Sequence, residues 1–288
     1  MIALGLAALG RPGYITSDHA SALGDRSPAA MEAHCHAVLD AAYAHGIRWF
    51  DAARSYGRAE EFLSRWIASR GVQVTVSSKW GYRYTADWQV EATHHEIKDH
   101  SLAALDRQIA ESRALLALDL YEIHSVTPDS PVLDDAAVID RLASLRDGGL
   151  PIGLSLSGPH QRAVLERALE ISVGGTPLFS TVQATWNLYE RSVEPALIAA
   201  KARGLRVMIK EALANGRLMS DARLGPHPDR TALGVALGKS FVDVVLSGAA
   251  SVAQLESNVL AVPLADDFAE LAIAPDRYWS ERSRLPWN

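Results

Sequence analysis

Short apolar segments alternate with longer segments of helical period along almost the whole chain. Eight short segments of β-branched or apolar residues predict β-strands, at residues 2–6, 47–51, 72–79, 120–124, 152–155, 180–184, 205–210 and 242–247. An amphipathic segment after each predicts a helix, at residues 31–44, 59–66, 101–118, 134–146, 161–170, 193–203, 232–238 and 252–260. Because parallel strands need a crossover connection, which a helix supplies, this alternation predicts a parallel sheet.

The number and length of these units favour a closed barrel. Eight strand–helix pairs in about 260 residues match the size of a (β/α)₈ TIM barrel. A doubly wound sheet usually carries G-x-G-x-x-G after its first strand, and this chain has no such motif there. We therefore expect one α/β domain over residues 1–288, with the barrel over 1–263 and an extra C-terminal helix and tail over 264–288.

Composition and charge narrow the class of function. The 288 residues include 28 basic and 34 acidic side chains, a net charge of −6, which argues against a general nucleic-acid binder. The single cysteine, Cys35, fits a reducing compartment, and no apolar segment reaches the roughly 20 residues of a membrane helix. The apolar segment 1–10 lacks preceding basic residues and favours a buried strand over a signal peptide. We expect a cytoplasmic protein, a monomer or small homo-oligomer, with a small-molecule partner and neither nucleic-acid nor membrane partners.

Polar residues close most of the predicted strands, and in a (β/α)₈ barrel the chemistry lies at these carboxyl ends. They are Asp51, Lys79, His124, Ser155, Gln183, Lys210 and Ser247. Any one of them could be a turn or cap residue. A carboxylate, an ammonium and an imidazole on three consecutive strands should instead converge on one mouth and perturb each other's pKa values.

Tyr56, in the loop five residues after Asp51, completes this group. A phenol is a poor acid or base at neutral pH, but a neighbouring ammonium is expected to lower its pKa, while Asp51 keeps Lys79 charged. His124 could donate a hydrogen bond to a substrate oxygen. The four residues predict a proton-transfer centre with an electrostatic clamp for a carbonyl that gains negative charge.

The order Asp51, Tyr56, Lys79 and His124 resembles the catalytic tetrad of the aldo-keto reductases. Further segments resemble motifs of that family over nearly the whole chain: 50–57, 78–81, 100–124, 152–155, 182–183 and 247–258. The resemblance implies an NAD(P)(H)-dependent oxidoreductase that interconverts an aldehyde or ketone with its alcohol. Tyr56 would be the general acid and base, Lys79 would modulate its pKa, and His124 would orient the carbonyl.

The resemblance also implies a nicotinamide cofactor across the barrel mouth. Ser155 and Gln183 would hold the carboxamide, Asp51 would lie near the ribose, and the stem of Lys210 could cover a ring face. Main-chain N–H groups at a helix start would favour the phosphates. The residues expected at this adenosine end are Ser247, Gly248, Ala249, Ser251, Gln254 and Asn258.

Three positions depart from the family pattern. Leu156 replaces an asparagine that often follows the carboxamide serine, and Lys210 stands where many members stack a tyrosine. Gln254 stands where many NADPH-preferring members place an arginine on the 2′-phosphate. With segment 213–217, the last feature is similar to the branch of sugar and pyridoxal dehydrogenases. We expect NADPH, on the family's usual preference, with NADH as the alternative, and a sugar or another small carbonyl compound as substrate.

Aromatic residues near the strand ends predict the lining of a substrate pocket: Tyr14, Trp80, Trp88 and Trp186. No metal site is expected, because His34 and His36 do not share a helix face and residues 94–100 miss the H-E-x-x-H spacing. Gly238-Lys-Ser240 lacks the other features of a P-loop.

Two other functions remain open from the residues. A Schiff-base aldolase could use Lys79 or Lys210, although Tyr56 and Gln183 would then have no obvious role. A non-catalytic redox sensor could bind the nicotinamide cofactor on the same fold.

Overall fold

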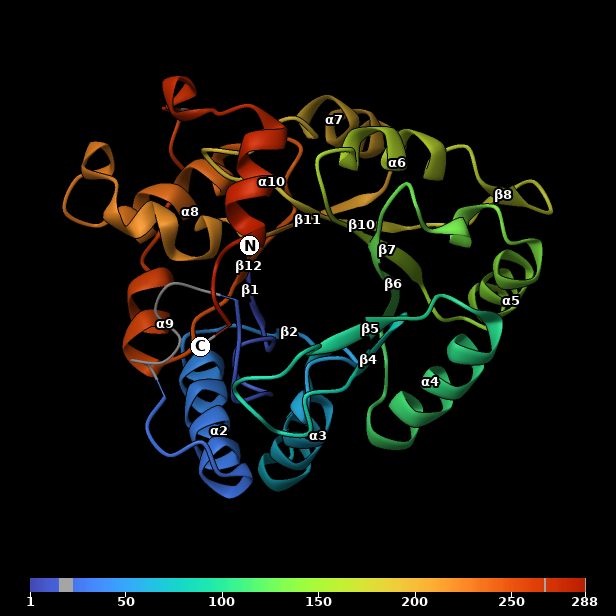
Figure 1. Ribbon diagram of the computed structural model, residues 1–288, viewed down its shortest axis with the longest axis horizontal. Helices are drawn as coiled ribbons and strands as arrows, with labels where there is room; N and C mark the ends of the chain where they lie inside the picture. Colours follow the sequence, from blue (N-terminus) through green and yellow to red (C-terminus); the bar gives the residue numbers. More distant parts are fainter. Residues whose placement is uncertain (16–22, 267, 288) are drawn as a thin grey trace.

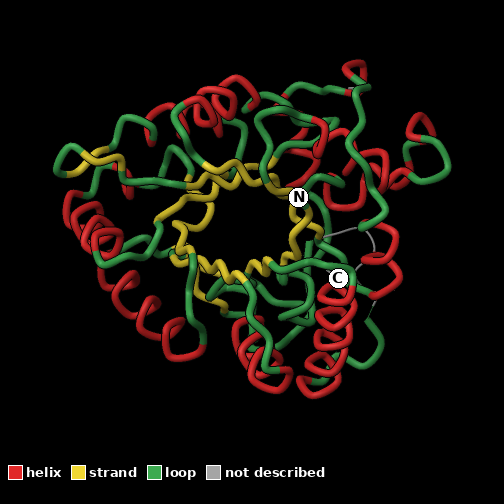
Figure 2. The backbone as a smooth tube through the Cα atoms, turned by 180° about the vertical axis from the view of Figure 1, so that it is seen from behind, coloured by secondary structure: helices red, strands yellow, loops and turns green. Residues whose placement is uncertain are grey.

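The computed structural model describes residues 1–15, 23–266 and 268–287. Eight parallel strands in these ranges close into a barrel in the order β1-β12-β11-β10-β7-β6-β3-β2 (Figures 1 and 2). Their bounds are Ile2–Gly5 (β1), Trp49–Asp51 (β2), Thr75–Trp80 (β3), Leu120–Val126 (β6), Ile152–Leu156 (β7), Thr181–Thr185 (β10), Arg206–Lys210 (β11) and Val244–Ser247 (β12). The predicted (β/α)₈ fold is confirmed.

Helices surround the strands in a ring (Figure 2). They are α2 (Pro28–Ala44), α3 (Ala59–Arg70), α4 (Leu102–Leu115), α5 (Ala136–Asp147), α6 (Gln161–Ala168), α7 (Glu194–Ala202), α8 (Pro228–Gly238) and α9 (Val252–Asn258). Helix α2 begins three residues before its predicted start, because the hydroxyl of Ser27 accepts from the N–H of Ala30 and Pro28 occupies the first turn. Strand β3 begins at Thr75, three residues after its predicted start, where its pairing with β2 begins.

Smaller elements lie in the loops between these units. Strands β4 (Tyr82–Tyr84) and β5 (Glu96–Lys98) form a hairpin after β3, and β8 (Ser172–Val173) pairs with β9 (Thr176–Pro177) before β10. Short 3₁₀ segments are η1 (Pro131–Leu133), η2 (Ala214–Ser220), η3 (Ala222–Leu224) and η4 (Ala269–Leu271). The C-terminal segment carries α10 (Pro275–Ser283), on the side of β11 and β12 in Figure 1.

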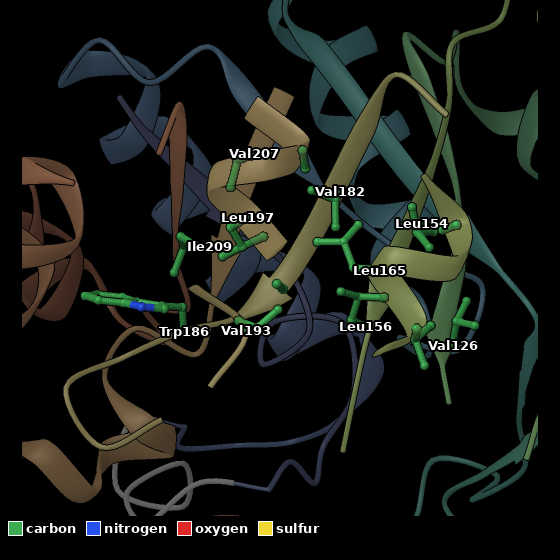
Figure 3. Packing of buried hydrophobic residues seen from close by; sticks show 14 of the residues in the cluster. Val126, Leu154, Leu156, Leu165, Val182, Trp186, Val193, Leu197, Val207 and Ile209 are labelled. Carbon is green, nitrogen blue, oxygen red and sulfur yellow. The ribbon is translucent and has the colours of Figure 1, made fainter. Parts of the chain in front are cut away.

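Apolar side chains fill the layer between the barrel and its helices. Strands β7 and β10 are buried at every position, as expected when both faces of a parallel sheet are covered. Figure 3 shows this layer around β7, β10 and β11, with Leu154, Val182 and Val207 packed near Leu165 and Leu197. The helices therefore hold the strand ends, and the polar groups on them, in fixed positions.

Across the described ranges, no helix combines the length and apolar character that a membrane crossing requires.

Candidate active site

A cavity of about 850 Å³ lies at the carboxyl ends of the strands, within the range of small-molecule sites. One part is lined by Asp51, Tyr56 and His124. It extends past Gln183 to the loop between β12 and α9, which includes Ser247, Gly248 and Ala249. Residues predicted from distant strand ends therefore meet at one cavity.

Asp51 and Lys79 form a buried ion pair beneath this cavity. They lie on the paired strands β2 and β3 and are 2% and 0% exposed. The Lys79 Nζ contacts Asp51 Oδ2 and donates to the carbonyl of Ala52 at 3.0 Å. The Ser77 hydroxyl donates to Asp51 Oδ1 at 2.7 Å. These bonds compensate two charges that would be costly to bury singly.

Tyr56 lies in the loop after β2, with its ring between Lys79 and His124. The Lys79 Nζ is 5.1 Å from the ring centroid, and the His124 ring is 5.4 Å away and nearly perpendicular. The pKa of Tyr56 lies well above its usual value, because of burial first and the Asp51 carboxylate second. The net shift is therefore upward, opposite to the expected lowering, because burial and the Asp51 carboxylate outweigh the nearby cations.

His124 lies on β6 as a neutral imidazole. Its Nδ1 is 3.3 Å from the Ser55 hydroxyl, and its carbonyl is bonded to His100 Nε2 at 2.8 Å. Burial, followed by the charges of Lys79 and Lys210, holds the pKa of His124 well below its usual value. In the tautomer in which Nδ1 accepts from the Ser55 hydroxyl, Nε2 carries the hydrogen and can donate to an oxygen in the cavity.

Strand β6 is irregular directly after His124. Its register with β7 shifts between Ile123 and Val126, and Ser125 adopts a left-handed φ of 50°. The Ser125 N–H donates to the hydroxyl of Ser155 at 2.8 Å. Ser155, predicted to contact the cofactor, thus braces the strand that carries His124.

Glu122 is a buried carboxyl that sequence reasoning missed. Its Oε2 accepts from Gln183 Nε2 at 3.1 Å, and the same nitrogen is 3.4 Å from Asp51 Oδ1. Burial raises the pKa of Glu122, and the nearby Asp51 carboxylate raises it further, although Lys79 opposes both effects. Its position in the sequence could have identified it, because Glu122 lies two residues before His124 and both side chains therefore point to the same face of the strand.

Five of the six predicted cofactor residues of the β12–α9 segment line the far part of the cavity: Ser247, Gly248, Ala249, Gln254 and Asn258. The hydroxyl of Ser247 lies 2.9 Å from the Asn258 side-chain amide and 3.3 Å from the Ala249 N–H. Gln254 accepts from the Ala250 N–H at 2.8 Å through Oε1, which holds its side chain against the loop. Ser251 caps α9 by accepting from the Gln254 N–H.

Lys210 closes β11 and lines the cavity, as its strand-end position predicted. Its Nζ donates to Thr185 Oγ1 at 3.0 Å, and burial lowers its pKa to about 8. The next residue, Glu211, binds Arg282 of α10 through Nε and Oε2 at 2.8 Å. Burial opposes ionisation of Glu211, but Arg282 and Lys210 outweigh it and hold its pKa at about 2. The C-terminal helix is thus anchored to the cavity wall.

The predicted pocket aromatics are mostly wrong. Tyr14 lines the cavity, but in the described part of the chain Trp80, Trp88 and Trp186 do not. Trp80 follows Lys79, so it points to the outer face of β3 and is fully buried in the core, as is Trp186 (Figure 3). Trp88 packs on α3 and donates to the carbonyl of Arg26.

Four residues outside the predicted aromatic set line the cavity: Arg11, Glu96, Arg282 and Trp287. Glu96 lies on β5 within the histidine-rich segment 94–100, and Trp287 lies in the C-terminal tail. In the ranges that the structure covers, no three His, Cys, Asp or Glu side chains are grouped to hold a metal ion.

Comparisons with known proteins agree with the barrel fold. The model of the aldo/keto reductase family matches residues 2–233. No curated protein sequence matches the chain significantly.

Among solved structures, a Pseudomonas aeruginosa protein assigned to the aldo-keto reductases is similar, with a TM-score of 0.67 and 24% identity over 94% of this chain and 90% of that one. A second Pseudomonas aeruginosa structure with the same assignment has a TM-score of 0.66 and 22% identity, covering 94% and 89% of the chains. The holo form of an aldo-keto reductase from Bacillus halodurans has a TM-score of 0.70 and 19% identity, covering 98% and 91%. At these identities the structures support the fold alone.

Proposed function

The chain belongs to the aldo-keto reductase family, whose members reduce carbonyl compounds with NAD(P)H, and we propose that Tyr56 is its proton donor. The observation that carries this proposal is that Asp51, Tyr56 and His124 line one part of a cavity large enough for a small molecule, with Lys79 buried beneath it as the ion-pair partner of Asp51. The proposed substrate is a small aldehyde or ketone, for which a sugar is one candidate.

The residues at the cavity fit a nicotinamide cofactor. The side chains of Gln183, Ser247 and Asn258 line it with amide and hydroxyl groups. A Cβ built on Gly248 meets none of the described atoms within 4 Å, so the loop leaves space for a ligand against its backbone. The bound nicotinamide supplies the hydride. NADPH is the proposed form, and Gln254, a neutral residue, is the feature that favours NADH.

The state of each side chain suits carbonyl reduction. Because its pKa is raised, Tyr56 holds its proton at neutral pH and can donate it to the carbonyl oxygen. His124, as a neutral donor through Nε2, can orient the same oxygen. The Lys79 ammonium, 5.1 Å from the phenol ring, opposes the negative charge left on Tyr56. In the oxidation direction the same tyrosine accepts the proton.

The Schiff-base alternative has weak support at Lys79. That residue is fully buried, is paired with Asp51, and is absent from the cavity lining within the described ranges. Lys210 lines the cavity with a lowered pKa, so borohydride trapping of a substrate on lysine would be the observation in favour of an aldolase.

Cofactor binding and turnover test the proposal together. Purified protein is titrated with NADPH and NADH by fluorescence, and a panel of aldehydes, ketones and sugars is then added. Tyr56→Phe should lower turnover by at least about 100-fold while cofactor affinity is retained, because it removes a proton and little surface. Tyr43→Phe, on helix α2, is the matched control.

Three results would contradict the proposal. Absence of cofactor binding would refute the reductase function. Activity of Tyr56→Phe above about a tenth of wild type would refute the role of the tyrosine. Binding of cofactor without turnover of any compound would favour the redox sensor.

A further inference from the structure

We propose that Arg11 is a positioning residue for this reaction: it is a second cation, besides Lys79, that stabilises the ionised form of Tyr56, and Glu96 moderates its charge. The inference rests on the proposed role of Tyr56 in proton transfer. It assigns a function to the loop after β1.

The guanidinium of Arg11 is held against the loop that carries Tyr56. Arg11 is 2% exposed, and its Cζ lies 5.3 Å from the centroid of the Tyr56 ring. Its Nη1 donates to the carbonyl of Ser55 at 3.1 Å and to Glu96 Oε2 at 2.9 Å. Because Ser55 directly precedes Tyr56, the first of these bonds ties the cation to the backbone next to the phenol.

Tight backbone packing fixes this arrangement. The N–H of Arg58 donates to the carbonyl of Gly10 at 2.7 Å, so the loops after β1 and β2 lie against each other. A Cβ on Gly10 would lie 2.3 Å from the carbonyl of Tyr56, and one on Gly57 would lie 2.9 Å from the Cβ of Arg11. Glycine at both positions therefore allows the two loops to approach closely, with Arg11 beside the loop that carries Tyr56.

Aromatic rings enclose the guanidinium on its other sides. Its Cζ lies 5.1 Å from the ring of Tyr14 and 4.8 Å from that of Trp287 in the C-terminal tail. Ring faces attract a cation, and they exclude the water that would screen it. Within the described structure the Arg11 Nε is buried without a hydrogen-bond partner. The charge is therefore desolvated beside Tyr56 and only partly compensated.

Charged and titratable groups face Tyr56 from five elements: Asp51 of β2, Lys79 of β3, His124 of β6, Glu96 of β5, and Arg11 and Tyr14 of the loop after β1. The positive charge of Lys79 is offset by the carboxylate of Asp51, its ion-pair partner, which is buried to a similar extent. The Arg11 side chain is 3% exposed and that of Glu96 is 24%, so solvent screens the carboxylate more than the guanidinium. Arg11 acts to lower the pKa of Tyr56, and Glu96 acts to raise it.

Variants of this ion pair should change proton transfer in opposite directions. The assay is oxidation of the alcohol whose carbonyl form turns over fastest in the panel above, measured from neutral to alkaline pH. The rate rises with pH as Tyr56 ionises, so this rising limb reports its pKa. Arg11→Gln should move the limb to higher pH by about one unit, which lowers the rate at a given pH by up to about tenfold. Glu96→Gln should move the limb to lower pH, by less than the shift expected for Arg11→Gln, and should raise the rate at a given pH.

Conservative and remote variants separate charge from structure. Arg11→Lys keeps the cation and should keep the limb near that of wild type. Arg65→Gln removes a surface arginine that pairs with Glu32 and Glu61 on the outside of the barrel, and should leave the limb unchanged. If Arg11→Gln fails to fold, Glu96→Gln and Arg11→Lys still carry the test, because faster oxidation is not an effect of misfolding.

The inference is overturned if the limbs of all variants superimpose, or if the Arg11→Gln and Glu96→Gln limbs move in the same direction. A raised KM in Arg11→Gln with an unmoved limb would show that Arg11 holds substrate instead. Tyr56→Phe distinguishes failure of the proposed function from failure of the proposed role of Arg11. If that variant stays active, the proposed function fails; if it is inactive while the limbs superimpose, only the role of Arg11 fails.

Discussion

Acidification should destabilise this protein through His100, which is bonded to the backbone of His124. The ring is 9% exposed, its Nε2 is bonded to the carbonyl of His124 at 2.8 Å, and its Nδ1 lies 2.6 Å from the hydroxyl of Ser130. The rings of Trp80 and Tyr82 pack against it at 5.7 and 6.0 Å. Burial lowers the pKa of His100 to about 4, although its bond to the His124 carbonyl acts in the opposite direction.

The size of the effect follows from proton linkage. The imidazole of an unfolded chain titrates near pH 6.5, so between about pH 6.5 and about pH 4 the unfolded state binds more protons than the folded state. Stability contributed by the neutral His100 is therefore lost as the pH falls through this window. Between about pH 7 and about pH 5 the loss is about 2 kcal/mol. His124, whose pKa is also lowered, acts in the same direction.

Urea denaturation followed by tryptophan fluorescence measures this loss. The free energy of unfolding is compared at the two pH values for wild type and His100→Gln, so that other titrating groups cancel. The pH-dependent loss should be smaller by about 2 kcal/mol in the variant. His45→Gln, at the exposed C-terminus of α2, should keep the wild-type dependence. Equal pH dependence in wild type and His100→Gln would refute the argument that burial keeps this imidazole neutral.

Three further substitutions test the surrounding structure. Gly57→Ala should destabilise the fold by about 2 kcal/mol in urea denaturation, because φ is +60° and the added Cβ would lie 2.4 Å from the carbonyl of Gly10; wild-type stability would contradict this packing. Gln254→Arg should favour NADPH over NADH by about tenfold in fluorescence titrations, and an unchanged ratio would place the 2′-phosphate contact elsewhere. Arg282→Gln should lower the free energy of unfolding by about 3 kcal/mol, because the buried carboxylate of Glu211 loses its hydrogen-bonded cation and keeps the longer contact with Lys210, at 3.9 Å. Arg277→Gln, which breaks an exposed pair on the same helix, is its control and should change little; equal losses in both variants would argue against the buried pair.

Local sequence patterns account for the fold and for the residues at the strand ends. Strand and helix periods are properties of short segments, and the need of parallel strands for crossovers converts their alternation into a barrel. The same topology brings every strand end to one mouth, so Asp51, Lys79 and His124 could be grouped before any contact was known.

Contacts between distant segments decide the remainder of the site. Trp80 adjoins Lys79 in sequence, yet strand alternation turns it into the core, while Trp287 reaches the cavity from the C-terminal tail. The ion pair of Arg11 and Glu96 joins residues 85 positions apart. The direction of the Tyr56 pKa shift depended on burial, which outweighs the nearby ammonium. Desolvation and charge pairing arise only when loops far apart in the chain close over one another, and local periodicity carries no information about that closure.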